Sequence, residues 1–207
     1  MNNLKKESVY SQLIEFVAML RGWKIKMICR AMYGRRVRIG SGFRVYGSGA
    51  LIKAGFGGRG SIIIGDNCDI RNSTKYNPVG IFKPSSIVVK DGCILIGSNV
   101  GLSGVSIFCS KSITIEDYVT IGANTSIFDT DFHSLDPDER IKDHSRPFAG
   151  GVVSTPVKIR RNAFIGLQCI LLKGSDIGEN AIVGAGVVGG IKCCSSAIVI
   201  SSSNIIK

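Results

Sequence analysis

Branched aliphatic residues recur at every sixth position over long stretches of this chain. The spacing is unbroken in the last third, where the recurring residues are Ile159, Ile165, Leu171, Ile177 and Val183. A period of six fits neither an amphipathic helix nor an alternating strand, so it predicts a repeat architecture with six-residue units. Three earlier runs share the spacing: Ile39, Val45 and Leu51; Val89 and Leu95; and Ile115, Ile121 and Ile127.

Such units are expected to form a parallel β-helix, in which three units make one triangular coil of about eighteen residues. The aliphatic residues would stack inside the prism, and each coil would contact mainly its neighbours, so the ends need caps. Glycine often follows the aliphatic residue, because a corner needs backbone angles that Gly adopts without a Cβ clash. Small residues occupy a second inward position near a corner: Cys68, Val119, Thr125, Ala163, Cys169, Ser175, Ala181 and Val187.

The pattern divides the chain into three parts. Residues 1–34 are expected to form a basic helical segment, in which Gly22 can divide a helix over residues 4–33 into two pieces. The β-helix then covers residues 35–190, and residues 191–207 form a C-terminal tail.

Two segments interrupt the repeat. Residues 72–86 contain two prolines, so a loop is predicted there. Residues 128–156 lose the pattern completely. Because a long excursion from a regular solenoid is usually functional, we expect the active site in this second segment.

The N-terminal segment carries most of the charge. The chain has a net charge of +11, and residues 1–38 hold nine Lys and Arg against Glu7 and Glu15. Two interpretations remain open for its helix: it lies on an anionic membrane surface, or it caps the prism or contacts another subunit. Nucleic acid is the weakest candidate partner, because aromatic residues are not interleaved with the basic ones. The apolar stripe of this helix is Val9, Leu13, Phe16, Val17, Leu20, Trp23, Met27, Ile28 and Ala31.

The seven cysteines do not suggest a disulfide framework. Cys68, Cys93 and Cys169 fall at the small inward position, so we interpret them as packing thiols in a reducing compartment, the cytoplasm. The sequence contains no run of about eighteen apolar residues, so no membrane-spanning helix is predicted. The N-terminus also lacks the apolar core and cleavage site of a secretory signal.

The excursion opens with the sequence DTDFHSLD, which contains the candidate catalytic base, His133. A neutral imidazole can take a proton from a hydroxyl at working pH, and the carboxylate of Asp131 or Asp129 would fix its tautomer. The alternative is that Asp-x-His only caps a loop. His144, the second histidine, is expected to be a loop residue with a small chance of contacting substrate. Two histidines cannot form a three-His zinc site within a subunit, so no metal is expected.

Three segments resemble the hexapeptide-repeat acyltransferases, and specifically the O-acetyltransferases of bacterial surface polysaccharides. They are GSNVGLSGVSIF (residues 97–108), ITIEDYVTIGANTSIFDTDFHSLD (113–136) and the repeat over residues 157–188. The resemblance implies an all-β fold, a left-handed parallel β-helix of hexapeptide repeats with an N-terminal α-helical segment. It also implies a homotrimer with acetyl-CoA, the co-substrate, lying between adjacent prisms, and an acceptor sugar that can be lipid-linked.

The resemblance and the residues of this chain together predict a set of site residues. His133 would be the general base, with Asp131 as its catalytic partner. Ser103, Asp129 and Phe132 would contact the acceptor. The residues expected to bind the cofactor are Phe164, Gly166, Leu167 (whose backbone N–H would stabilise the oxyanion), Ala185 and Lys192.

The chain departs from these relatives in its last segment, residues 189–207. It lacks their prolines and their Gly-Asn-Pro-Ala-Lys run, which helps to hold the adenine and phosphate end of the cofactor. Lys192, Lys173, Arg160 or Arg161 could supply positive charge instead. Three functions follow. The first is acetyl-CoA-dependent O-acetylation of a surface-polysaccharide sugar. The second is N-acetylation of a nucleotide-linked amino sugar or acetylation of a small molecule. The third is a non-catalytic scaffold.

Overall fold

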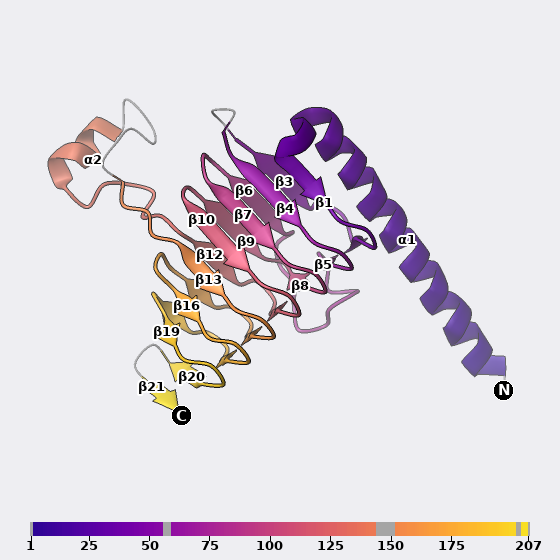
Figure 1. Cartoon of the computed structure of the whole chain (residues 1–207). Coiled ribbons are helices and arrows are strands. Elements are labelled where there is room, and N and C mark those ends of the chain that lie inside the picture. Colours follow the sequence, from indigo (N-terminus) through magenta and orange to yellow (C-terminus); the bar gives the residue numbers. More distant parts are fainter. Residues whose placement is uncertain (1, 56–58, 144–151, 202–203, 207) are drawn as a thin grey trace.

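A computed structural model describes residues 2–55, 59–143, 152–201 and 204–206. In these residues the chain winds into a triangular prism with three parallel sheets, one for each side (Figure 1). Each turn of the chain adds one strand to each sheet in the order A, B, C, and we call one such turn a coil. We name each corner by the two sheets that it joins. The predicted left-handed parallel β-helix is confirmed.

The strands are short, as the hexapeptide period requires. Sheet A contains β1 (Val37–Ile39), β4 (Ser61–Ile64), β7 (Cys93–Ile96), β10 (Ser112–Ile115), β13 (Val157–Ile159), β16 (Asp176–Ile177) and β19 (Lys192–Cys193). Sheet B contains β2 (Arg44–Tyr46), β5 (Asp69–Arg71), β8 (Gly101–Ser103), β11 (Thr120–Ile121), β14 (Phe164–Ile165), β17 (Ile182–Val183), β20 (Ile198–Ser201) and the antiparallel β21 (Asn204–Ile206). Sheet C contains β3 (Leu51–Ala54), β6 (Ser86–Val89), β9 (Ser106–Cys109), β12 (Ser126–Phe128), β15 (Ile170–Leu171) and β18 (Val188–Gly189).

The core is a set of aliphatic columns, one behind each sheet. In-register pairing places Ile113 beside Ile94 on one side and Val157 on the other, and all three are fully buried. The predicted inward residues from Ile115 to Ile127 and from Ile159 to Val183 are likewise buried. All eight predicted small inward residues are also buried.

The predicted register is wrong by one residue in two places. Leu51 and Leu95 are 49% and 38% exposed, and their neighbours Ile52 and Ile94 point inward instead. In these four-residue strands two alternating positions face the core, so a simple six-residue count can select the wrong neighbour. For the same reason Cys93 is only half-buried, and Cys109 is the fully buried thiol in that part of the prism. All seven cysteines are free.

Many corners turn through a residue with positive φ, which is asparagine at five positions. Asparagine adopts this left-handed conformation more readily than most residues with a Cβ, so it suits these turns. The five are Asn67, Asn99, Asn124, Asn162 and Asn180.

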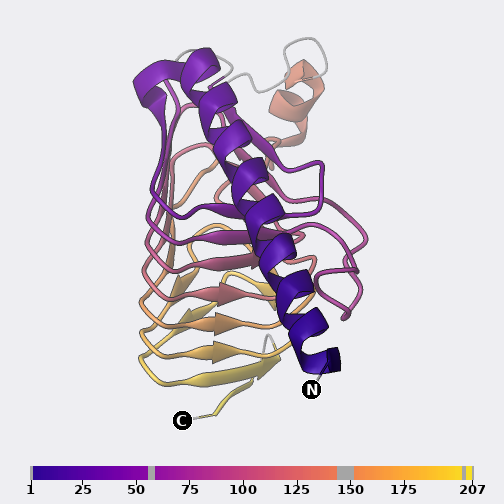
Figure 2. The ribbon, with the colours of Figure 1, turned by 90° about the vertical axis from the view of Figure 1, so that its right-hand side faces the viewer.

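A single long helix, α1 (Asn2–Tyr33), lies across the first coil and caps that end of the prism (Figure 2). The helix is continuous through Gly22, where the sequence predicts a break. Gly22 is instead the point where α1 comes closest to the first coil, since a Cβ there would overlap the carbonyl oxygen of Phe43. Ala18 and Cys29 are buried on the same side of the helix. A 3-10 turn, η1 (Gly34–Arg36), leads from α1 into β1.

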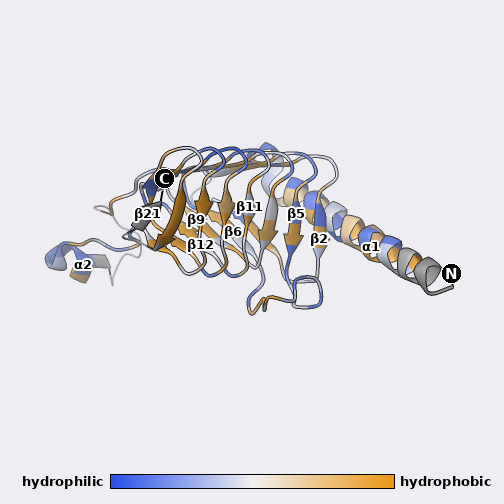
Figure 3. Cartoon of the chain, turned by 90° about the horizontal axis from the view of Figure 1, so that it is seen from below, coloured by the Kyte–Doolittle hydropathy of each residue, from blue (hydrophilic) through white to orange (hydrophobic). Residues whose placement is uncertain are grey.

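The prism continues beyond residue 190, the end that the repeat pattern predicts. β19 pairs with β16 and β20 pairs with β17, so residues 191–201 form most of another coil. Residues 204–206 then fold back against β20. The described end of the chain therefore lies at the opposite end of the prism from α1 (Figure 3).

Candidate active site

The excursion leaves the prism at the C/A corner, after β12, and returns at β13. Its base is a short antiparallel pairing, in which Thr130 bridges Ser154 and the Thr155 N–H donates to the Asp129 carbonyl at 2.8 Å. Farther out lies the helix α2 (Pro137–Asp143), whose start is capped by the side chain of Asp136 (Figure 1). Residues 129 to 131 therefore belong to this antiparallel pairing, and Phe132 and His133 follow directly after it.

Asp129 fixes the excursion to the preceding coil. Its side chain is fully buried, and its carboxylate accepts hydrogen bonds of 2.7 Å from the backbone N–H groups of Ser110, Lys111 and Ser112. The thiol of Cys109 also donates to it, at 3.3 Å. Burial and the adjacent Asp129 carboxylate raise the pKa of this thiol, so Cys109 stays protonated. Asp129 therefore positions the chain, and the expectation that it contacts substrate is not supported by this geometry.

Asp131 connects the excursion to the following coil. Its Oδ1 accepts a hydrogen bond from Nζ of Lys173, which lies at the C/A corner after β15, at 2.7 Å. Its Oδ2 is buried and has no hydrogen-bond partner among the described residues. From the sequence, Lys173 is expected only as a source of charge for the cofactor, because nothing in a sequence separation of 42 residues indicates this pairing.

Phe132 and His133 complete the turn. Phe132 has a φ of +64°, an uncommon backbone conformation for an aromatic residue. Its ring packs on Phe108 and Phe128, with ring centroids 4.9 and 5.2 Å away, and these contacts hold the turn against sheet C. The backbone N–H of His133 donates to the Asp131 carbonyl at 2.7 Å, and the imidazole is exposed. The imidazole of His133, the candidate general base, thus lies on a well-packed turn.

Ser103 lies elsewhere on the prism. It ends β8 at the B/C corner, it is 6% exposed, and its hydroxyl accepts a hydrogen bond from Asn77 at 3.0 Å. His133 lies at the C/A corner, so one protomer does not bring these two residues together. Ser103 instead anchors the segment between β5 and β6, as predicted an irregular loop, against the prism.

Four of the predicted cofactor residues lie close together along sheet B and the B/C corner. Phe164 is 46% exposed on β14, and Gly166 and Leu167 form the corner that follows. Ala185 lies at the same corner one coil later, so close that a Cβ on Gly166 would clash with its backbone nitrogen. Lys192 is on β19 of sheet A, which is the opposite side of the triangle. The structure therefore does not place Lys192 with the other four within one protomer.

No group of metal-ligating side chains is present among the described residues. His144 lies outside the described residues. The described part of the site therefore offers an imidazole, a carboxylate–ammonium pair and, at a neighbouring corner, the half-buried Leu167.

No family model and no curated protein matches the chain, but solved structures do. A variant of AntD, an N-acyltransferase from Bacillus cereus in complex with dTDP and coenzyme A, superposes with a TM-score of 0.62 at 17% identity, covering 88% of each chain. Maltose O-acetyltransferase from Clostridium difficile gives 0.52 at 18% identity, covering 100% of this chain and 88% of its own.

A third match is the hexapeptide-repeat acetyltransferase VCA0836 from Vibrio cholerae, complexed with acetyl coenzyme A. Its TM-score is 0.51 at 16% identity, covering 92% of this chain and 85% of its own. At these identities the likeness concerns the fold. The chain has the left-handed β-helix fold of the hexapeptide-repeat acyltransferases.

Proposed function

We propose that this protein is an acetyl-CoA-dependent O-acetyltransferase that acts on a hydroxyl of a bacterial surface-polysaccharide sugar. The observation that carries the proposal is the position of His133. It is an exposed imidazole on a turn that Asp129, Phe132 and Asp131 hold to the prism from three directions. A base that must meet an acceptor needs both access to solvent and a rigid mount.

In this reaction His133 takes the proton of the acceptor hydroxyl while the hydroxyl oxygen attacks the thioester carbonyl. The backbone N–H of Leu167 donates to the oxyanion of the tetrahedral intermediate. Asp131 supports the imidazolium through Oδ2, the carboxylate oxygen that Lys173 leaves unused. The thiolate of coenzyme A leaves and takes up the proton from His133, so the base is regenerated.

The proposed groups need a second protomer. In one prism His133 lies at the C/A corner and Leu167 at the B/C corner, separated by the width of sheet C. A neighbouring prism packed alongside would bring its B/C corner close to the first protomer's C/A corner. This requirement supports the homotrimer, with one site in each of three clefts between subunits. Lys192, on sheet A, would then serve a cofactor bound to a neighbour's corner.

The cytoplasm is the compartment that suits this reaction. Acetyl-CoA is an intracellular thioester, and seven free cysteines are stable in a reducing environment.

The experiment measures the turnover of His133→Ala with sugar acceptors. Turnover is monitored as the release of free thiol from acetyl-CoA. We expect a loss of about a hundredfold or more, because general-base catalysis contributes about 10² to 10⁴. The same variant should keep the sedimentation coefficient and the affinity for coenzyme A of the unaltered chain. Full turnover of His133→Ala would exclude this imidazole as the base.

Two alternatives are separated by this assay together with calorimetry. The fold similarity to an N-acyltransferase favours an amino-sugar acceptor as the second candidate, and higher turnover with amines than with hydroxyls would select it. The altered C-terminal segment favours a non-catalytic scaffold, which requires that calorimetry detect no binding of coenzyme A.

A further inference from the structure

The helix α1 has two apolar faces, and only one of them is covered. Ala18, Gly22 and Cys29 are buried against the first coil. Residues on the opposite side of the helix, related by steps of three, four and seven positions, point away from the prism. They are about half-exposed or more, from 47% at Met27 to 63% at Trp23. We call this surface the outer face; it consists of Leu13, Phe16, Leu20, Trp23 and Met27.

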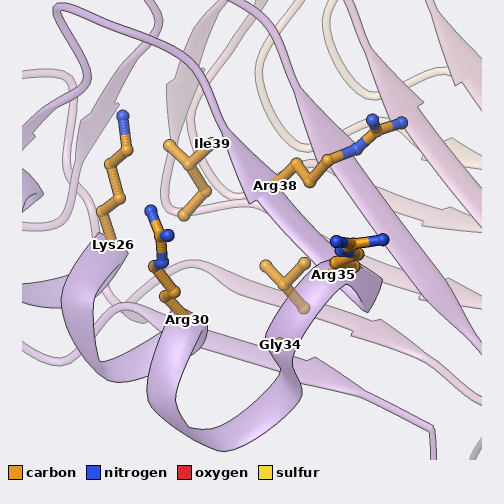
Figure 4. A pocket seen from close by; sticks show the side chains of 7 residues that line it. Lys26, Arg30, Gly34, Arg35, Arg38 and Ile39 are labelled. Atoms are coloured by element: carbon orange, nitrogen blue, oxygen red, sulfur yellow. The ribbon is translucent and has the colours of Figure 1, made fainter.

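A strongly cationic pocket adjoins the end of the same helix. It has a volume of about 380 Å³ and lies between the last turns of α1, η1 and β1. Lys26 and Arg30 extend from α1 on one side of the pocket. Arg35 of η1 and Arg38 of β1 lie on its other side (Figure 4). Val37 and Ile39 complete an apolar lining, and no described residue that lines the pocket is acidic.

Few carboxylates lie near this region. Asp66 is one of them, and hydrogen bonds, and then the nearby charge of Lys26, lower the pKa of its carboxyl. Glu15 is the one acidic residue between positions 9 and 38, against seven Lys and Arg. Its carboxylate accepts a hydrogen bond of 2.8 Å from the Tyr46 hydroxyl, on the side of α1 that faces the prism. The outer face therefore combines exposed apolar side chains with a positive pocket at one end.

We propose that α1 docks this end of the prism on a membrane of anionic phospholipids. The outer face would enter the interface between headgroups and acyl chains, and a lipid phosphate would occupy the pocket formed by Lys26, Arg30, Arg35 and Arg38. Complementary charge selects this partner, because apolar residues flanked by Lys and Arg bind bilayers whose surface is negative. No described helix could itself span a membrane, so this contact is peripheral.

Docking of α1 on a membrane does not require acyl transfer, but it agrees with an acceptor held on a lipid carrier. In a trimer whose prisms are parallel, all three copies of α1 would lie at the same end, and the three contacts would act together.

Trp23 is the single tryptophan of the chain and lies on the outer face, so its fluorescence reports docking directly. The intact protein is titrated with vesicles of phosphatidylcholine, with or without phosphatidylglycerol. We expect a blue shift and quenching by brominated acyl chains only with phosphatidylglycerol present, and a loss of binding at high salt. Inorganic phosphate serves as the soluble probe and should cause no blue shift.

Two pairs of variants locate the contact. Arg30→Gln/Arg35→Gln should weaken binding about thirtyfold, since each cation near the surface contributes a factor of about five to six. Lys111→Gln/Lys158→Gln removes equal charge from the exposed surface near sheet A and should have little effect. Phe16→Ser/Leu20→Ser should weaken binding about tenfold or more, whereas Val79→Ser/Phe82→Ser, which removes two exposed apolar side chains elsewhere, should not.

Three results would overturn the proposal: no blue shift with anionic vesicles, equal weakening by both members of a pair, or a change of oligomeric state in Phe16→Ser/Leu20→Ser without vesicle binding by the unaltered chain. The last result would make the outer face a contact between subunits. Vesicle binding by His133→Ala should equal that of the unaltered chain, so failure of docking and failure of the proposed catalysis can be told apart.

Discussion

Lys173 and Asp131 form an ion pair across two coils, with Nζ 2.7 Å from Oδ1 and both side chains less than a third exposed. The pair attaches the first residues of the excursion to the coil that follows. His133, two residues further on, therefore depends on a contact that its own sequence neighbourhood does not contain.

Lys173→Met should lower both stability and turnover. Loss of the ammonium leaves a mostly buried carboxylate without its partner, which we expect to cost about 1 to 2 kcal/mol of unfolding free energy. If Asp131 then binds the imidazole differently, the pH profile of kcat/KM should also shift. Urea unfolding and kinetics are measured for Lys173→Met, Asp131→Asn and the double variant. Additive effects in this cycle would show that the pair does not act as a unit.

Asp129→Ala should destabilise the protein more than Asp131→Asn does. The change leaves three backbone N–H groups of the β9–β10 corner without an acceptor, at a cost of about 3 kcal/mol or more. The denaturation midpoint at fixed protein concentration is the measurement. If Asp129 instead contacts substrate, the variant would raise KM at unchanged stability.

Gly22→Ala tests how closely α1 packs against the first coil. Helix propensity alone predicts that alanine stabilises the helix by about 1 kcal/mol. The overlap with the Phe43 carbonyl predicts the opposite sign, with a cost of about 1 to 3 kcal/mol as the helix shifts. The sign of the change in thermal midpoint gives the answer, and stabilisation would mean that α1 lies farther from the first coil.

Tyr46 should titrate late. Burial, and then the adjacent Glu15 carboxylate, raise its pKa to about 12, against about 10 for an exposed tyrosine. The folded state thus holds this proton more tightly, so the stabilisation is complete below about pH 10 and is lost as the pH rises toward about 12. Tyrosinate absorbance should show one late step among five tyrosines. The step should move earlier in Glu15→Gln and vanish in Tyr46→Phe, and its survival in Tyr46→Phe would assign it to another residue.

The fold could be predicted from the sequence because a hexapeptide solenoid is a local structure. The residue that stacks on Ile165 is its equivalent in the next coil, Val183, so the period alone identifies the core. The prediction was wrong where local information is ambiguous. Leu95 and Ile94 are both large and aliphatic, and only strand pairing decides that Ile94 faces inward.

The site could be predicted only in part. The interruption of the period located the excursion and His133, but the roles of the two aspartates depend on contacts made in three dimensions. Asp129 is bound by a turn that lies about twenty residues earlier, and Asp131 by a lysine in the following coil. The spacing of residues could not predict that Lys192 lies on the opposite side of the prism from Leu167. Irregular segments interrupt the six-residue period, so counting along the sequence does not show to which sheet a later residue belongs.

The number of stacked coils fixes the distance between α1 and the excursion that carries His133. The excursion leaves from the fourth coil, three strand spacings or about 15 Å from the coil that α1 covers. Inserting or deleting one complete coil would change that height by about 4.8 Å and leave both α1 and the histidine turn intact. Under the proposed function, the number of coils would therefore set the distance between the docked helix α1 and the sugar that is acetylated.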